Sequence, residues 1–238
     1  MSRVVISQSM LFPWAGMLEQ VRLADHFVHY DDVQYSKGSF TNRVQVKTAS
    51  GMKWMTAPLD NLHLGQAISE VRIAPVATFR NRHIDLLRAS LAEAPFRQDA
   101  LDIADSVYAG DHQTIAGLAR ASMLALIDYF GLSGGRTFRD VGSLGITGSG
   151  SERVLAIVRA LGGTSYVTGH GAARYLDHAA FEAAGIAVDY MDYRKAPYPQ
   201  SHGAFTPYVT GLDLVAHCGP SGIDFINSPT RPWKEFLT

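Results

Sequence analysis

The sequence predicts an α/β protein: a mainly parallel sheet with crossover helices, plus a β-hairpin and a central helical insertion. Three patterns support this. Short β-branched segments alternate with amphipathic ones near both ends of the chain, as in strand–helix–strand units. Period-two hydrophobicity surrounds a Gly-containing turn, as in a hairpin. Hydrophobic residues at helical spacing fill the middle. We expect residues 1–238 to form a single α/β domain, with 79–131 as a helical insertion or subdomain.

The first third of the chain contains strands, one helix and the hairpin. Residues 3–7 (RVVIS) read as a buried strand, 14–25 as an amphipathic helix and 27–30 (FVHY) as a second strand. Residues 41–58 alternate around a short turn and form the expected hairpin, and 71–73 add a further strand.

Three helices are expected in the middle, at 79–91, at 101–108 and from a cap at Asp111 to Gly131. Beyond them Ser149 and Glu152 have the spacing of a capping box. Four further elements follow: a helix that starts there and ends at the glycines 162–163, a strand at 164–168, a helix at 175–184 and a strand at 186–190, with one short helix near 212–217.

Composition limits the classes of protein. The 238 residues are 47% hydrophobic and 18% charged, so the chain can bury a core. With a net charge of -1, the chain lacks the excess of basic residues that is typical of DNA-binding proteins. A lone cysteine, Cys218, excludes an internal disulfide framework and fits a reducing compartment. The chain has no secretory h-region and no membrane-length apolar stretch. We expect a cytoplasmic protein with a small-molecule substrate and no membrane or DNA partner.

Polar residues follow the predicted strands. Because parallel strands end at one edge of a sheet, ligands bind beyond their carboxyl ends. The residues that this rule brings to one rim are Gln8, Asp31, Asp32, Gln34, His170 and 192–194. The alternative is that these are ordinary polar loops. Asp31 and Asp32 point to opposite sides of an extended chain, so one can bind a ligand, act as a base or hold Mg²⁺, while the other caps the strand.

The segment after the first strand joins Gln8 to Pro13, Trp14 and Gly16. Pro13 suits the first turn of a helix, whose free N–H groups can meet an anion. Gly16 lets a neighbouring group approach closely, and Trp14 can floor a pocket. The alternative is that Trp14 belongs to the core.

Two further segments carry anion-binding residues. On the hairpin, Arg43 and Lys47 share a face beside Asn42 and can clasp a phosphate or carboxylate, although a solvated face also explains them. The glycine-rich 145–153 leads into a helix start and contains Ser151 and Arg153. It lacks the known phosphate-loop motifs, so a well-capped helix explains it equally. No Cys and His set has metal-ligand spacing, and Cys218 reads as an inert, semi-buried thiol.

Several of these residues together resemble the WbqC-like family. The matching residues are Gln8, Pro13, Trp14, Gly16, 31–35 (DDVQY), Asn42, Arg43, 151–153 (SER), Tyr175, Leu176, Phe181, Pro197, Tyr198, Gln200, Phe205 and Asp213. Ser9 and Met17 depart from the family pattern, which has proline and an aromatic residue there. The resemblance implies a biosynthetic enzyme, a group transferase, and adds Tyr35, Ser151 and Gln200 to the candidate substrate-binding residues. The chain is also distantly similar to nucleotidylyltransferase folds, but Trp14 and Met17 stand where those have histidines.

Three functions remain open. The first is acyl or aminoacyl transfer to an amine on a small metabolite such as an amino sugar, from a carrier-bound or tRNA-bound donor. Asp31, Asp32 or His170 would take the proton. The second is an ATP-dependent nucleotidyl- or adenylyltransferase, the one reading in which ATP and Mg²⁺ take part. The third is a substrate-binding module without catalysis.

Overall fold

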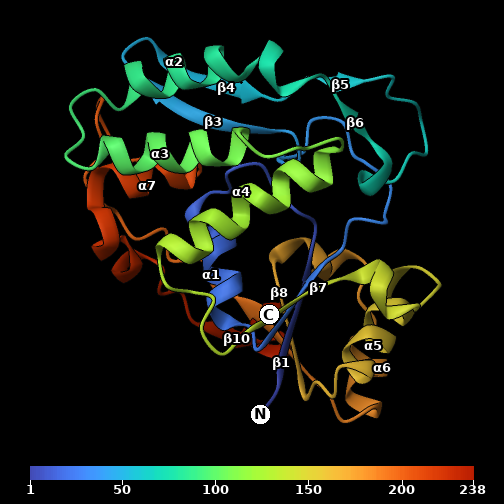
Figure 1. The fold of residues 1–238 in the computed structure, drawn as a ribbon. Coiled ribbons are helices and arrows are strands. Elements are labelled where there is room, and N and C mark those ends of the chain that lie inside the picture. The colour runs from blue at the N-terminus through green and yellow to red at the C-terminus, as the bar shows by residue number, and fades with distance from the viewer.

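The computed structural model describes residues 1–238 and is built on one six-stranded sheet (Figure 1). Its strands lie in the order β10-β9-β8-β1-β2-β7. The pairs from β9 to β7 are parallel, and β10 runs antiparallel to β9. The strands are β1 Arg3–Ser7, β2 His26–His29, β7 Thr137–Asp140, β8 Ser165–Thr168, β9 Ala187–Met191 and β10 Thr230–Pro232. The α/β class with a mainly parallel sheet is therefore confirmed.

Chain order and sheet order together define a doubly wound sheet. Numbered along the chain, the six strands are arranged 3-2-1-4-5-6, so the winding direction reverses between β1 and β8. Helix α1 (Ala15–Leu23) connects β1 to β2. On the other half, α5 (Gly150–Ala160) precedes β8, and α6 (His178–Ala183) connects β8 to β9.

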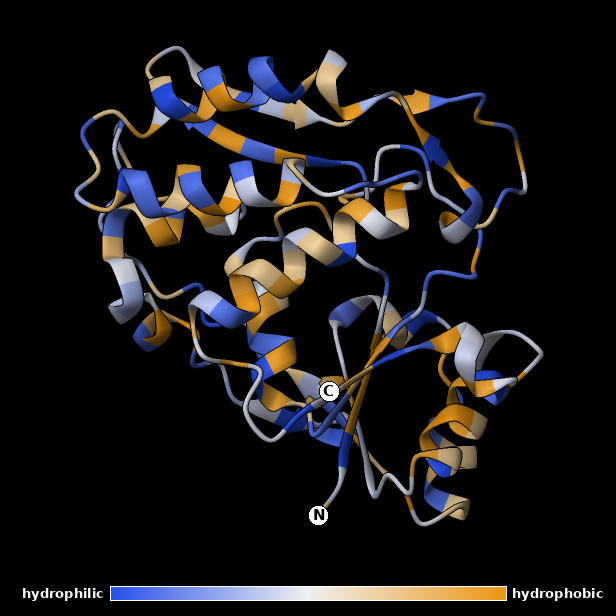
Figure 2. Ribbon diagram, viewed as in Figure 1, coloured by the Kyte–Doolittle hydropathy of each residue, from blue (hydrophilic) through white to orange (hydrophobic).

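Alternating side chains of β1 bury the two faces of the sheet. Val4 and Ile6 pack into a core with residues of α5 and α6. Val5, between them, faces the larger core that includes α1. This alternation is the expected consequence of the strand pleat, and the central strands are among the most hydrophobic segments of the chain (Figure 2).

A helical layer lies beside α1 (Figure 1). It contains α2 (Arg80–Ser90), α3 (Arg97–Tyr108), α4 (Ile115–Tyr129) and α7 (Gly211–Cys218), with α3 packed against both α4 and α7, and α4 in contact with α1 (Figure 1). The hairpin of β3 (Arg43–Thr48) and β4 (Gly51–Thr56) contacts α2. A second small pair joins β5 (Leu59–Asp60) to β6 (Arg72–Ile73), and α8 (Trp233–Phe236) ends the chain. No helix combines the length and apolarity needed to cross a membrane.

Some local predictions differ from the structure. The N-cap of α4 is Thr114, whose hydroxyl accepts the Gly117 N–H, and not Asp111. Helix α3 begins at Arg97 instead of residue 101. Strands β7 and β10 were not expected. The side chains of β7 are mostly exposed, so its sequence lacks the apolar run that marks a buried strand.

Candidate functional site

A cavity of about 850 Å³ opens at the carboxyl ends of β1, β2 and β8. It lies where the winding of the sheet reverses, the position at which doubly wound sheets bind their ligands. Four of the sequence-predicted residues line it, namely Gln8, Asp32, Gln34 and Arg153. Gln8, Asp32 and Gln34 follow β1 and β2, as predicted from the rule that ligands bind beyond the carboxyl ends of parallel strands (the strand-end rule), and Arg153 comes from the start of α5. We call this space the switch-point cavity.

Asp32 and Arg153 form a bidentate ion pair in the cavity wall. The two guanidinium nitrogens Nη1 and Nη2 lie 2.9 and 2.5 Å from the two carboxylate oxygens. Arg153 is held further by its Nε, which donates to the Ile146 carbonyl, and by the Tyr30 ring, 5.1 Å away. The hydrogen bond to Asp32 raises the pKa of Arg153. The Arg153 side chain is 9% exposed and that of Asp32 is 33% exposed, so the carboxylate is the member of the pair open to a ligand.

The start of α5 forms another part of the wall, through Gly148, Ser149 and Gly150. The predicted capping box is absent, because the N-cap Ser149 makes no side-chain hydrogen bond to the helix. The first N–H groups of α5 therefore lack a side-chain cap and can bind an anion. Gly148 and Gly150 have φ of 106° and 58°, a backbone conformation that favours glycine. Ser151 is turned away, since its hydroxyl accepts the Asp177 N–H.

Asp31 lies outside the lining of the cavity and is fully buried. Its carboxylate accepts the N–H and the hydroxyl of Ser9 at 2.8 and 2.7 Å, and the Nε of Arg120 at 2.6 Å. Arg120 also pairs with Asp140. The Ser9 hydroxyl lies 2.9 Å from Nδ1 of His29, whose pKa burial lowers to about 4. Asp31 thus joins the ends of β1, β2 and β7, and Ser9, a departure from the family pattern, is one of its partners.

His170 and Trp14 also lie outside the lining of the cavity. The His170 ring packs 4.7 Å from Phe236, and its Nε2 lies 3.1 Å from the Met191 carbonyl, although both chain neighbours of His170 line the cavity. Trp14 packs edge-on against two tyrosines, Tyr193 and Tyr208.

Gly16 makes room for the Trp14 ring. A Cβ on Gly16 would lie 2.1 Å from that ring, far inside van der Waals contact. The close neighbour that the glycine admits is therefore Trp14 itself.

The predicted residues of the hairpin region form internal contacts. The Tyr35 hydroxyl donates to Asn42, whose amide donates to the Ala57 carbonyl. Arg43 donates to the Gly38 carbonyl, and its guanidinium lies 4.1 Å from the centre of the Trp54 ring. These contacts tie the segment after Asp32 to the hairpin.

Lys47 is buried, so the alternative interpretation of this hairpin face as solvent-exposed does not hold for it. Its Nζ donates to the carbonyls of Gly203 and Ala204 at 2.9 and 2.6 Å and lies 3.3 Å from Oε1 of Gln200. The Gln200 side-chain amide donates to the Thr206 carbonyl, and its Oε1 accepts the Thr206 N–H. Lys47 and Gln200 meet each other here, away from the switch-point cavity.

Comparison with known proteins identifies the family of this chain. Residues 8–225 match the model of the WbqC-like protein family. The chain belongs to this family. It is also 28% identical over 229 residues to the uncharacterized protein Rv1507c of Mycobacterium tuberculosis (strain ATCC 25618 / H37Rv), an alignment that covers 95% of this chain and 98% of that one. No solved structure matches.

In this WbqC-like chain the structure adds lining residues that the sequence argument missed. Tyr166 and Thr168 come from β8, and Tyr175 follows it. Burial raises the pKa of Tyr166, so its hydroxyl stays protonated at neutral pH. For Tyr166 and Thr168 the available signal was their position in a predicted strand, but β8 is buried throughout, so its sequence does not mark which side chains face a ligand.

A second cavity, of about 420 Å³, borders the first. Its lining includes Gln34, Tyr35, Lys37 and His63. Gln34 lines both cavities, so one side chain can contact the occupants of each. The arrangement offers two adjoining spaces, one beside a carboxylate and a helix start, the other beside a lysine.

Proposed function

We propose that this WbqC-like chain is a biosynthetic group transferase that moves an acyl or aminoacyl group onto an amine of a small metabolite such as an amino sugar. The observation that carries the proposal is the Asp32 carboxylate, held by Arg153 and partly open to the switch-point cavity. Volumes of roughly 300–1,000 Å³ are typical of small-molecule sites, and this cavity lies in that range.

In the proposed reaction, the acceptor amine lies against Asp32. Its nitrogen attacks the carbonyl carbon of an ester or thioester donor, a C–N bond forms and the C–O or C–S bond breaks. The amine proton passes to Asp32 and from there to the leaving oxygen or sulfur. The amides of Gln8 and Gln34 can bind acceptor hydroxyls as donors or acceptors. The uncapped start of α5 suits an anionic part of the donor, from a carrier or tRNA.

Two neighbouring cavities support a two-substrate reaction. Because Gln34 lines both, acceptor and donor can lie side by side at this residue. Lys37, in the second cavity, adds a positive charge for the anionic substrate.

The test is native mass spectrometry of the purified protein against nucleotide sugars, acyl thioesters, aminoacyl-tRNA and ATP. We expect one class to bind, and Asp32→Asn and Arg153→Met each to weaken that binding. Asp128→Asn is the matched control, because Asp128 is exposed and outside the cavity. Binding that neither cavity substitution weakens would contradict the proposed site. Binding without turnover beside a working pathway enzyme would instead favour a binding module.

One observation favours a second candidate, an ATP-dependent nucleotidyl- or adenylyltransferase. The 3-2-1-4-5-6 strand order is that of dinucleotide-binding sheets, in which phosphates meet a glycine-rich helix start. Here Gly148, Ser149 and Gly150 would contact the phosphates, Arg153 would neutralise their charge, and Asp32 would hold Mg²⁺. Isothermal titration with ATP and Mg²⁺ tests it, and the absence of heat at millimolar ATP would refute it.

A further inference from the structure

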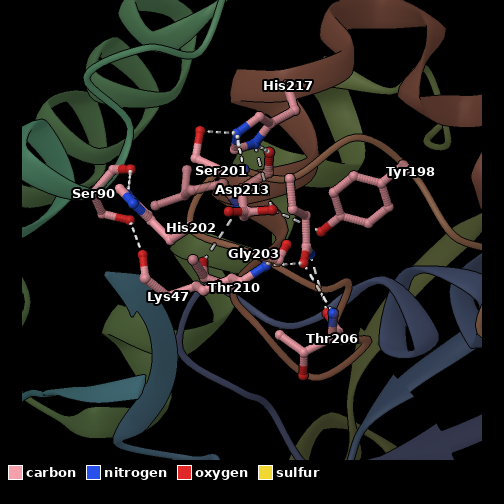
Figure 3. A network of polar contacts seen from close by, with 12 residues as sticks. Lys47, Ser90, Tyr198, Ser201, His202, Gly203, Thr206, Thr210, Asp213 and His217 are labelled. Carbon is pink, nitrogen blue, oxygen red and sulfur yellow. Dashed lines mark hydrogen bonds and ion pairs between the residues drawn. The ribbon is translucent and has the colours of Figure 1, made fainter. Parts of the chain in front are cut away.

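A hydrogen-bonded chain links Ser201, in the loop before α7, to His217 and Asp213 in α7 (Figure 3). The Ser201 Oγ lies 2.9 Å from Nε2 of His217. On the other side of the ring, Nδ1 lies 2.9 Å from the Asp213 carbonyl oxygen and 3.5 Å from its Oδ2. Asp213 and His217 share one face of α7, because they are four residues apart. The Tyr198 hydroxyl donates to the Asp213 carboxylate at 3.0 Å.

The backbone determines which nitrogen of His217 carries the proton. The Ser201 N–H also points at Nε2, at 3.0 Å, and an N–H can only donate. Nε2 of the neutral ring is therefore the acceptor, and Nδ1 holds the proton and donates to the Asp213 carbonyl oxygen, with the Asp213 carboxylate 3.5 Å away. This is the tautomer in which an imidazole takes a proton from a serine hydroxyl while an aspartate orients it.

The exposure and charge of these side chains are consistent with Ser201 as the nucleophile and His217 as its base. The side chains of His217 and Asp213 are 6% and 4% exposed, whereas Ser201 is partly exposed in a surface loop. The base is thus more buried than the residue that carries the hydroxyl. Burial acts to lower the pKa of His217, but the hydrogen bonds and charge of Asp213 outweigh it and raise that pKa above its ordinary value.

The loop after Ser201 presents free N–H groups. Lys47 holds the carbonyls of Gly203 and Ala204, and a trans peptide points its N–H opposite to its C=O. The Ala204 N–H therefore points away from Lys47. His202 has φ 65°, in the left-handed region, and its N–H and that of Gly203 make no hydrogen bond within the protein. In α/β-hydrolases, the N–H of the residue after the nucleophile binds the oxyanion, and His202 stands at that place.

We propose that Ser201, His217 and Asp213 form a second nucleophilic centre, separate from the switch-point cavity, that accepts an acyl group from an accessible ester or thioester. Ser201 Oγ bonds to the carbonyl carbon while its proton moves to Nε2 of His217. That proton passes to the leaving alcohol or thiol as the C–O or C–S bond breaks. Water or an amine then attacks the acyl-serine, gives its proton to His217, and Ser201 regains it as the acyl group departs.

A fluorophosphonate probe tests this on the full chain, with the modified peptide located by mass spectrometry and p-nitrophenyl acetate hydrolysis as the second readout. We expect labelling at Ser201 in the wild type and in the control Ser133→Ala, whose serine is exposed and makes no side-chain hydrogen bond. His217→Gln should slow both reactions about 100-fold or more. Wild-type hydrolysis should rise with pH through a pKa above 6.5, and Asp213→Asn should move that rise to lower pH.

The wild-type protein alone can refute the proposal, so the result does not depend on a variant that folds poorly. Absence of label from Ser201 would overturn it. Label at Ser201 that forms equally fast in a folded His217→Gln variant would also overturn it, because the hydroxyl would then react without its base. A purely structural network would alter the melting temperature of these variants but would give no probe reaction to lose.

Discussion

Asp31 and Asp32 are chain neighbours with different environments, so replacement by asparagine should mainly reduce stability at Asp31 and mainly reduce ligand binding at Asp32. Asp31→Asn changes a carboxylate with no exposed surface that accepts two hydrogen bonds from Ser9 and one from Arg120. Breaking a buried ion pair by removing one partner costs about 3–5 kcal/mol. In this variant Arg120 still pairs with Asp140, and its side chain is 22% exposed. We therefore expect a loss of stability at the lower end of that range, about 3 kcal/mol.

For a chain of this length, that loss corresponds to a melting temperature lower by roughly 6–12 °C. Asp32→Asn should cost less than Asp31→Asn, because the Asp32 side chain is 33% exposed, but it should weaken ligand binding in the switch-point cavity. Urea unfolding followed by circular dichroism, with native mass spectrometry on the same samples, measures both. An Asp31→Asn variant within about 0.5 kcal/mol of wild type, or one less destabilised than Asp32→Asn, would refute the reasoning.

Three further perturbations follow from the packing. Gly16→Ala puts a Cβ 2.1 Å from the Trp14 ring, so we expect a loss of about 1–3 kcal/mol and a shift in tryptophan fluorescence; an unchanged spectrum and stability would contradict that contact. Lys47→Met leaves the carbonyls of Gly203 and Ala204 unpaired, and should cost about 2 kcal/mol and speed hydrogen exchange across residues 200–206, seen by mass spectrometry. Burial holds the His29 pKa near 4, below its ordinary 6.5. Between these two pH values the unfolded chain therefore binds more protons than the folded one. The free energy of unfolding should fall by up to about 3 kcal/mol as the pH drops from 6.5 to 4, which urea unfolding measures. His29→Asn should reduce this dependence on pH.

Much of the fold was predictable because it depends on local patterns. The β-branched run of β1 and the helical spacing of α2 carry their own periodicity, and the strand-end rule then brought Gln8, Asp32 and Gln34 to one cavity. The edge elements were not predictable in the same way. β7 is mostly exposed and β10 contains a proline, so neither shows the hydrophobic pattern of a strand, and only their pairing partners define them.

The sequence by itself determined the class of fold, the family and a set of polar residues at strand ends. The tertiary structure decided the environment of each one. Asp31 meets Arg120 across 89 positions of sequence separation, and Lys47 meets Gln200 across 153. Hydrophobic periodicity indicates which face of a strand or helix is buried, but not which distant residues meet that face. Burial and ion pairing depend on groups that the fold brings from elsewhere, and these differ for two adjacent aspartates.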